Sequence, residues 1–549
     1  MVTTDYELCT SCNIQFQLTA QEIDFYRRIE VPQPQRCPDC RQKLRLAWRN
    51  ERYLYRRRSA LSGKPTIAFY HEDSPYTVYS QEEWWSDRWD GKAYGTEYQP
   101  HRPFFEQLGE LIAKIPQMAI LISHGENSDY CPYSVYYKNS YMCISGYEGE
   151  NCYYGYQVIR SRDCADCSVL YESELCYECT YSLKLYNSLY CHECESSSDL
   201  AFSTDCIGCD HCIGCFGLRR KSYHLFNEPC SKETYAQTLS AILHSYERSR
   251  QFLDEHKKFC VDKTHRPFKI VNCENSSGDY LWNCKNTIQS FVCRELEDGG
   301  YCWNIPVRAK DLYDANYSPS EFTYNVLSVV NGYNAIASVF SWDVSDVAYC
   351  FQCFYGNHLL GCAGLKHSSY CILNKQYGHD DYETLRKKIR EELLSQGLWG
   401  EFLPAKLSPF GYNETIAQDY FPLTPAEAAR QGFHWSVEHL SPTGPPATYT
   451  PHGSIEEVPD TIVDEVLSCV DSGRGFRIIP QELTFYRSFK LPIPTKSPEQ
   501  RYRERMSREN SRKVFRRACP KCSAEFLSTF PLQSPERVFC NNCYLMERY

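Results

Sequence analysis

Small residues recur every twelve positions between about residues 125 and 218. They fill two columns three residues apart, and polar corners such as Asn139-Ser140-Tyr141 separate them. A fixed period with small inward residues is typical of a stacked β-solenoid. A turn of twelve residues has a perimeter of only about 40 Å, so small side chains must line its interior. The two columns are Ser128, Ser140, Cys152, Cys164, Cys176, Ser188, Leu200 and Cys212, and Cys131, Cys143, Gly155, Cys167, Cys179, Cys191, Ser203 and Cys215.

The end of this repeat appears a second time, 147 residues later. The sequence GCFGL at 214–218 returns as GCAGL at 361–365, and a helical pattern follows each copy, at 233–252 and at 381–394. We therefore predict a second solenoid over about 270–374, with Cys350 and Cys362 in phase and an irregular period over 284–302. Each solenoid is expected to end in a capping helix, which gives domains at 125–255 and 256–397.

The remaining middle segments have other compositions. Residues 84–124 are rich in Trp, Tyr and Phe, and we interpret them as a connector whose aromatic residues form core, with a base-stacking platform as the alternative. Residues 398–460 contain several prolines and predict an irregular segment followed by a linker.

The two ends of the chain are related at an ungapped offset of 460 residues. The segment QEIDFYR at 21–27 returns as QELTFYR at 481–487, and Arg41 and Arg45 map onto Arg501 and Arg505. We interpret residues 1–83 and 461–549 as two copies of one module.

Each copy carries one complete set of two CxxC pairs, and the two sets are different. The spacing suits a zinc ribbon, in which four thiolates hold a tetrahedral zinc and leave no open coordination position, so we predict two structural zinc ions. Buried free cysteines and an iron–sulfur centre are the alternatives. The predicted ligands are Cys9, Cys12, Cys37 and Cys40 in the first module and Cys519, Cys522, Cys540 and Cys543 in the second.

Each module has lost the set that the other one keeps. Cys9, Cys12, Cys37 and Cys40 correspond to Cys469, Ser472, Ser497 and Gln500, and the second set corresponds to Ser59, Ser62, Ser80 and Glu83.

The chain has 32 cysteines, and most of them lie in the predicted solenoids. A chain of this kind without a visible secretory signal favours a reducing, cytoplasmic location over a disulfide framework. Pairs such as Cys164/Cys167 and Cys176/Cys179 would stack on adjacent turns. We interpret them as small core residues, with zinc ligation and cross-turn disulfides as the alternatives.

The net charge of −10 argues against nucleic-acid binding, but the basic residues are clustered. Residues 41–58 and 501–517 each hold eight basic residues, lack Gly and Pro, and suit a helix. Arginine-rich helices beside the ribbons predict contacts to RNA phosphates, whereas pairing with the protein's own acidic middle is the alternative. The candidate residues are Arg41, Arg45, Arg49, Arg52, Arg56, Arg57, Arg58, Arg501, Arg505, Arg512, Lys513, Arg516 and Arg517.

Motifs for catalysis or membrane insertion are not visible. The sequence has no Gly-rich phosphate loop, no HExxH and no apolar run long enough to span a bilayer. We therefore expect no membrane association and no small-molecule substrate. An enzyme built on a solenoid face stays open as a third alternative.

The pattern CTSC…ExxFYxxxxxPxPxxCPxCR, continued by RNxRxLYxR, resembles the "probable zinc-binding domain" proteins, large cysteine-rich chains of candidate-phylum bacteria. The motifs GCxGL, NSxYC and PFGYNET extend the resemblance over essentially the whole chain. It implies zinc binding at Cys9, Cys12, Cys37 and Cys40 and no known activity. That family has a cysteine pair after LYxR, where this chain has Ser59 and Ser62, so a metal is not expected there.

Taken together, the sequence predicts a mainly β protein, with two short β-solenoids of about twelve-residue turns and capping helices, flanked by duplicated zinc-ribbon modules. We predict a non-catalytic, zinc-stabilised protein that binds RNA, such as ribosomal RNA, through its arginine helices. The alternative is a protein–protein interaction scaffold that presents Tyr-rich solenoid faces.

Overall fold

Strands outnumber helices in the described ranges, and two ladders of parallel strands contain the majority of the strands. The computed structural model describes residues 5–305, 309–316, 319–437, 446–451 and 453–548. Contacts divide the chain into two units, and each unit contains one ladder and one terminal module. The finer domain boundaries expected from the sequence stay predictions.

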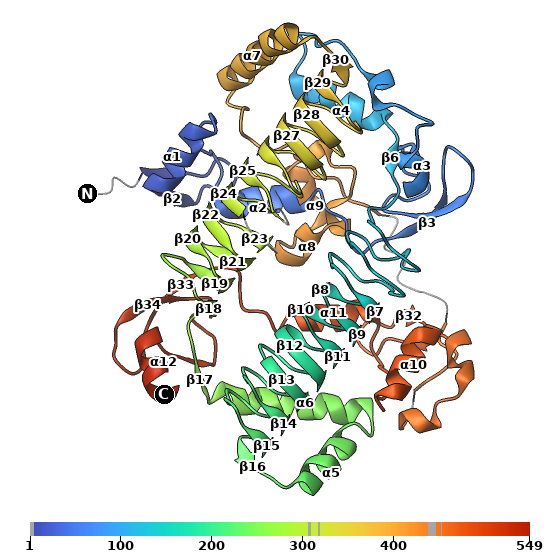
Figure 1. Cartoon of the computed structure of the whole chain (residues 1–549), viewed down its shortest axis with the longest axis vertical. Coiled ribbons are helices and arrows are strands. Elements are labelled where there is room, and N and C mark those ends of the chain that lie inside the picture. Colours follow the sequence, from blue (N-terminus) through green and yellow to red (C-terminus); the bar gives the residue numbers. More distant parts are fainter. Residues whose placement is uncertain (1–4, 306–308, 317–318, 438–445, 452, 549) are drawn as a thin grey trace. The chain divides into compact units, whose positions relative to one another are not determined.

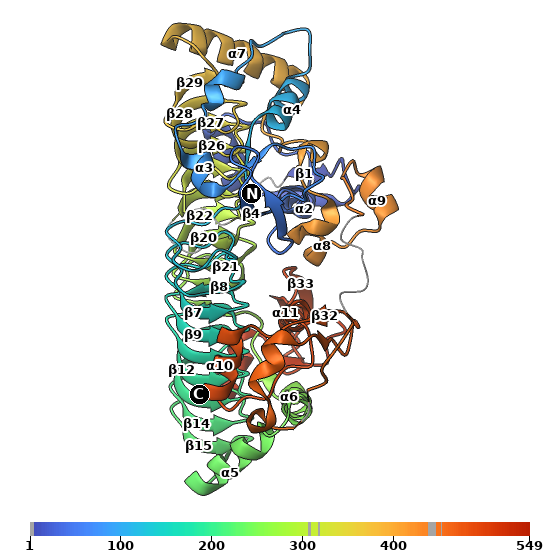
Figure 2. The same cartoon turned by 90° about the vertical axis from the view of Figure 1, so that its right-hand side faces the viewer.

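The first ladder lies in the unit made of residues 121–267, 438–511 and 515–549. Its strands pair in parallel at a shift of twelve residues, as in Cys152↔Cys164 and Cys164↔Cys176 (Figures 1 and 2). The antiparallel strand β16 (Glu228–Pro229) ends it. The parallel strands are β7 (Glu150–Tyr153), β8 (Tyr156–Ile159), β9 (Arg162–Ala165), β10 (Ser168–Tyr171), β11 (Glu174–Tyr177), β12 (Thr180–Leu189), β13 (Glu195–Ala201), β14 (Asp210–Ile213) and β15 (Ser222–Leu225).

A regular backbone bend accompanies this register. Every third residue from Tyr133 to Phe226 has a positive φ, including the predicted corner residues Asn139, Asn151 and Asp163. Short polar residues tolerate this left-handed conformation better than most side chains. Each straight piece is therefore only a few residues long, which explains why a strand prediction from alternation alone is weak here.

The second ladder lies in the unit made of residues 1–120, 268–437 and 512–514. Its register shift is mostly twelve, but it is eleven for Ile270↔Leu281 and thirteen for Gly300↔Tyr313. Within 285–300 the shift is twelve, so the irregularity predicted for 284–302 lies at the edges of that region. The strands are β18 (Ile270–Val271), β19 (Gly278–Trp282), β20 (Lys285–Ile288), β21 (Ser290–Arg294), β22 (Leu296–Gly300), β23 (Trp303–Ile305), β24 (Ala309–Tyr313), β25 (Glu321–Tyr324), β26 (Tyr333–Ile336), β27 (Trp342–Ala348), β28 (Phe354–Leu360), β29 (Ser369–Ile372) and the antiparallel β30 (Lys375–Gln376).

Helices follow both ladders, as the sequence predicts. The first ladder is followed by two helices rather than one, α5 (Lys232–Ile242) and α6 (Tyr246–Val261), because Ser245 caps a new helix start. The second is followed by α7 (His379–Ser395), and then by α8 (Ile416–Tyr420) and α9 (Pro425–Arg430).

The terminal modules share one order of elements. The first contains β1 (Asp5–Leu8), β2 (Gln15–Leu18), α1 (Ala20–Arg28), α2 (Pro38–Leu46), β3 (Tyr55–Arg58), β4 (Pro65–Ala68), β5 (Val78–Tyr79) and α3 (Gln81–Trp85). The second contains β31 (Leu467–Ser468), β32 (Gly475–Phe476), α10 (Pro480–Ser488), α11 (Pro498–Met506), β33 (Phe515–Ala518), β34 (Glu525–Ser528), β35 (Arg537–Val538) and α12 (Asn541–Arg548). β35 pairs in parallel with β17 (Thr264–His265).

The aromatic connector packs as core against the second ladder. It contains α4 (Phe104–Lys114) and β6 (Gln117–Met118). The ring centroids of Trp84 and Trp85 lie 5.4 and 4.7 Å from that of Phe354, and Phe105 lies 5.0 Å from Tyr349. These contacts favour the core interpretation over a base-stacking platform.

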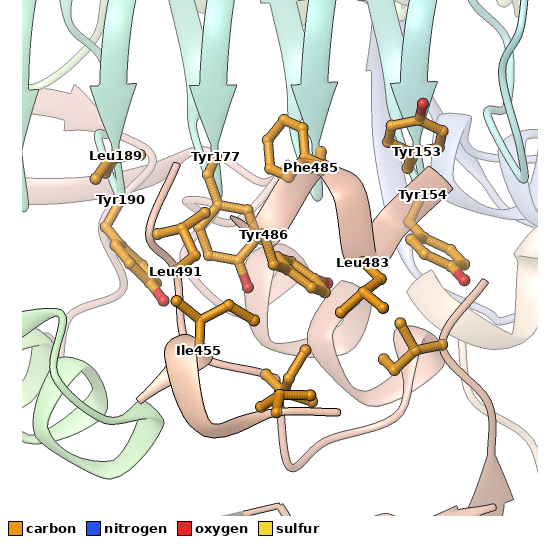
Figure 3. Close-up of a cluster of buried hydrophobic side chains, with 14 of the residues drawn as sticks. Tyr153, Tyr154, Tyr177, Leu189, Tyr190, Ile455, Leu483, Phe485, Tyr486 and Leu491 are labelled. Carbon is orange, nitrogen blue, oxygen red and sulfur yellow. The ribbon is translucent and has the colours of Figure 1, made fainter. Parts of the chain in front are cut away.

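An aromatic core joins the second module to the first ladder. Tyr177 on β11 lies against Tyr486 and Phe485 on α10, with centroids 6.0 and 6.2 Å apart (Figure 3). The other unit repeats the contact, since Tyr26 on α1 lies 5.2 Å from Tyr324 on β25. Tyr26 and Tyr486 correspond at the module offset of 460, and Tyr177 and Tyr324 at the ladder offset of 147. The two units therefore pair corresponding modules and ladders in the same way.

Candidate metal centres and the buried arginine interfaces

The first cysteine set converges at the end of a hairpin and the start of a helix. Cys9 and Cys12 lie in the turn between β1 and β2, while Cys37 is the N-cap of α2 and Cys40 lies in its first turn. The four sulfur atoms lie within 4.8 Å of one another, and the Cys12 and Cys37 sulfurs are 3.7 Å apart. A tetrahedral zinc with bonds of about 2.3 Å requires about 3.8 Å between sulfurs, so the donor set fits zinc.

The second set has the same arrangement in the other module. Cys519 and Cys522 follow β33, and Cys540 and Cys543 lie at the start of α12. The Cys522 and Cys540 sulfurs are 3.7 Å apart, and all four sulfurs again lie within 4.8 Å. When bound, zinc would join the hairpin turn to the helix and contribute to the stability of the module.

Backbone amides near each centre favour the thiolate form of one of its four cysteines. Burial opposes ionisation of Cys9, but backbone N–H groups led by that of Cys37 outweigh burial and lower its pKa to about 6. The Cys37 amide nitrogen lies 3.2 Å from the Cys9 sulfur. The pKa of Cys519 is also lowered to about 6 against burial, with the Cys540 amide as the first contributor. Thiolates are the species that bind zinc.

Serines and a glutamate fill the metal position that the first module has lost. Ser80 is the N-cap of α3, and the Ser59 hydroxyl bonds the Glu83 carboxylate. Burial raises the pKa of Glu83, but hydrogen bonds led by Ser59 outweigh burial and lower it to about 2. A buried carboxylate with hydroxyl donors thus replaces the cross-link that a metal would supply.

The lost site of the second module has a similar replacement. Ser497, which corresponds to the ligand Cys37, caps α11 by accepting a hydrogen bond from Gln500 N. Cys469 remains as a buried thiol. Burial raises its pKa, but hydrogen bonds led by that of Ser472 lower it to about 7. In both lost sites a serine lies at the N-cap of a helix, the position that a cysteine ligand occupies in the complete site of the other module.

The predicted basic helices are helical only in their first halves. Residues 41–46 and 501–506 belong to α2 and α11, but β3 and β33 contain residues 55–58 and 515–518. Both strands pair in antiparallel hairpins with β4 and β34. The prediction of one continuous helix was therefore wrong, because alternating exposed and half-buried side chains at 55–58 suit a hairpin.

Three arginines of the first module, two on α2 and one shortly after its end, are buried against the second ladder. Arg41 and Arg45 form ion pairs with Asp314, and Arg45 donates to the Asn325 side-chain oxygen at 2.7 Å. Arg49 pairs with Glu51 and contacts Ser328 at 3.3 Å. None of these three arginines is more than 2 % exposed.

The second module repeats this interface on the first ladder. Arg505 donates to Asp166 at 2.7 Å, and Arg501 lies 2.9 Å from the same carboxylate. Both arginines are at most 1 % exposed. Arg508, a further arginine of the same basic stretch, pairs with Glu178 at 2.6 Å. In these contacts the arginines pair with the protein's own acidic residues.

The other predicted basic residues have different surroundings. Arg57 and Arg517 are half-buried and donate to carbonyl oxygens, for example His71 O at 2.9 Å and Phe530 O at 3.2 Å. Arg512 lies over the rings of Trp303 and Tyr420. Arg52 lies 3.9 Å from Asp419 and Lys513 lies 3.8 Å from Asp39. Lys513, Arg56, Arg58 and Arg516 are exposed.

The cysteines of the ladders have a repeated role of their own. The Cys164 thiol donates to the carbonyl of Arg162 at 3.1 Å, two residues before it. Ser188, in the same column, donates to Tyr186 O at 2.9 Å in the same way. Burial raises the pKa of the Cys164 and Cys176 thiols well above their usual value. These contacts favour the interpretation as core residues.

One further group of possible metal donors lies on the first ladder. Asp199, Asp210 and His211 have donor atoms within 4.8 Å of one another and are partly exposed. Asp199 accepts a hydrogen bond from Asn187 at 2.6 Å, and Asp210 accepts one from Ser198 at 2.9 Å. Since ladder hydrogen bonds already use these oxygens, we assign no metal here.

A four-cysteine centre that spans a hairpin turn and a helix start defines a small zinc-binding module. A comparison with protein families matches residues 5–47 to the probable treble clef domain. This match covers the first centre and leaves the rest of the chain unassigned. No curated protein and no solved structure matches the chain. No helix in the described ranges is long and apolar enough to cross a membrane.

Proposed function

We propose that this chain is a non-catalytic, zinc-stabilised scaffold that binds protein partners. The observation that carries the proposal is a set of exposed tyrosines on the ladders. Tyr136, Tyr186, Tyr333 and Tyr355 are 48–52 % exposed. Rigid, half-exposed tyrosines supply contact area at low entropic cost and are enriched in protein interfaces.

A regular ladder keeps these side chains in fixed positions. The ring of Tyr355 stacks on that of His367 one rung further, with centroids 4.9 Å apart. His358 stacks on Tyr370 in the same way, at 4.8 Å. Side chains held by stacking lose little conformational entropy when a partner binds, which favours recognition.

We also propose that each ladder is a β-solenoid. Isolated bridges support this, because Ile144↔Tyr156 and Tyr147↔Ile159 have the same twelve-residue shift as the strands. Positive φ at every third residue would turn the chain four times in each twelve-residue coil. A solenoid would present its outer face as an extended, stiff surface, which suits a scaffold.

RNA binding is the second candidate, and Arg56, Arg58, Lys513 and Arg516 are the exposed residues that support it. Arg516 lies 3.0 Å from Glu525 on the neighbouring strand, so its charge is partly compensated. The buried arginines cannot reach phosphates without leaving their acidic partners. A protein partner is therefore the better-supported proposal.

Purification of the full chain after cross-linking in cells tests the proposal. We expect a protein partner that remains after ribonuclease treatment and is lost in a Tyr186→Ala, Tyr355→Ala double variant. Lys184→Ala is the matched control, since Lys184 is also exposed on the first ladder. Recovery of RNA that depends on Arg56 and Arg58 would instead establish the RNA alternative.

A further inference from the structure

The two modules differ at one edge of their first hairpin. β1 and β31 correspond at the offset of 460, and their registers agree: Glu7 pairs with Phe16 as Leu467 pairs with Phe476. In both hairpins the cysteine that follows closes the turn, through Cys9 N→Ile14 O and Cys469 N→Arg474 O. In an antiparallel pair, residues that bond the partner strand alternate with residues that do not. The backbone N–H and C=O groups of Tyr6 and of its counterpart Val466 therefore point away from the partner strand.

In the second module an extended segment occupies that edge. The amide of Thr448 donates to Val466 O at 2.8 Å, and Val466 N donates to the Thr448 hydroxyl at 2.9 Å. Tyr449 forms a parallel bridge to Leu467. Val466 is 4 % exposed and Leu467 is fully buried. Residues 448–449 thus cover the outer edge of β31 and bond both backbone groups of Val466.

In the first module the corresponding edge is open in the described part of the chain. Tyr6 and Leu8 are both 62 % exposed, and they project to the same side of β1 because strand side chains alternate. The adjacent Ile14 is 63 % exposed. An open strand edge bordered by apolar side chains is a template for an additional strand.

We propose that the outer edge of β1 binds an extended peptide segment of a partner protein by strand addition, parallel to β1. The second module indicates the chemistry of this segment: a hydroxyl residue opposite Tyr6, followed by an aromatic residue opposite Glu7. Main-chain hydrogen bonds would provide affinity, and the apolar side chains of Tyr6 and Leu8 would provide specificity. This inference rests on the proposed scaffold function and gives it a docking site.

The test uses a labelled peptide with the sequence of residues 446–451, Pro-Ala-Thr-Tyr-Thr-Pro, added to the full chain. We expect saturable binding with a dissociation constant below about 1 mM. Tyr6→Pro removes the outward amide and should weaken binding about 10-fold, because strand addition loses one hydrogen bond. Proline is tolerated at strand edges, so the module should still fold.

Two controls separate this site from the rest of the chain. Leu8→Asp keeps the backbone and should also weaken binding, through its side chain. Val466→Pro is the matched change in the second module and should leave binding unchanged. Zinc content in each variant checks that the module is folded.

Four results would overturn the inference. The first is absence of binding at about 1 mM peptide. The second is binding that persists in Tyr6→Pro and is lost in Val466→Pro, because the peptide would then displace residues 448–449. The third is self-association that Tyr6→Pro abolishes while the peptide does not bind, because the occupant would then be a second copy of the chain. A cross-linked partner that survives Tyr6→Pro would preserve the scaffold proposal and exclude this docking site.

Discussion

Arg505 on α11 donates a 2.7 Å hydrogen bond to Asp166 in the first ladder, and both side chains are buried although 339 residues separate them. Arg501 lies beside the same carboxylate, and Arg41 and Arg45 share Asp314 in the other unit. A duplicated ionic contact therefore fixes each module to its ladder.

Removal of the ladder carboxylate should destabilise the interface strongly. Asp166→Asn removes the carboxylate that Arg501 and Arg505 share and leaves Glu482 and Glu178 as their remaining counter-charges, and we expect a loss of about 3 kcal/mol in the free energy of unfolding. Asp314→Asn should act similarly in the other unit. Urea denaturation measures both effects.

The control for these variants is Glu174→Gln, in a surface ion pair with Arg162 whose side chains are 30 % and 58 % exposed. It should cost less than about 1 kcal/mol. Equal effects of the buried and surface variants would contradict the assignment of the buried contact.

Metal content should follow the two complete cysteine sets. The wild-type chain should hold two zinc ions, one for each group of four cysteines. Cys12→Ser and Cys522→Ser should each reduce the content by one ion and lower the melting temperature, because zinc binding contributes to the stability of the module. Elemental analysis of the purified protein measures this. Cys469→Ser, in a lost site, should keep both ions.

The ladder cysteines should tolerate replacement by serine. Cys164→Ser keeps a donor to Arg162 O, as Ser188 does for Tyr186 O further along the same column, so we expect a cost within about 1 kcal/mol. Zinc content should stay at two ions. Loss of a third metal ion in this variant would show that the ladder thiols bind metal.

Acid stability should depend on Glu83. Its folded pKa of about 2 lies below the ordinary value of 4.5. The lowered pKa therefore contributes stability above pH 4.5, and this contribution disappears as the pH falls from 4.5 towards 2. Glu83→Gln should remove up to roughly 3 kcal/mol at neutral pH and flatten the profile in that window.

Denaturation at a series of pH values measures this profile. The exposed neighbour Glu82 offers the matched control, and Glu82→Gln should leave the profile unchanged. If the free energy of unfolding of Glu83→Gln falls at low pH as it does in the wild type, the serine cluster does not stabilise the charged carboxylate.

The prediction of the cysteine sets and of the ladders depended mainly on the spacing of residues that are close together in the sequence. Two cysteines in one turn and two at one helix start need only short-range structure to converge, and the offset of 460 identified both sets. The twelve-residue period predicted the parallel register of the first ladder, because a repeated corner sequence repeats its backbone conformation. The offset of 147 found the second ladder, but the shifts of eleven and thirteen residues around Leu281 and Tyr313 have no comparable signal.

The sequence did not predict the buried arginine interfaces. Arg41 and Arg501 were visible as basic residues, but Asp314 and Asp166 lie hundreds of positions away, and their burial follows from the packing of module on ladder. The sequence does contain one indication of these interfaces. The two modules share an arginine and a glutamate at corresponding positions, Arg41/Arg501 and Glu22/Glu482. The two ladders share a tyrosine in the same way, Tyr177/Tyr324. Taken together, the module offset of 460 residues and the ladder offset of 147 residues indicate that corresponding modules and ladders contact each other in the same way.

The sequence by itself determined the two cysteine sets, the duplicated modules and the period of the ladders, because each depends on residues close together or on an exact repeat. Only the tertiary structure decided which ladder each module covers, which arginines are buried, and which hairpin edge is left open at Tyr6. These properties depend on burial and on charges contributed by distant segments, and no local pattern along the chain encodes them.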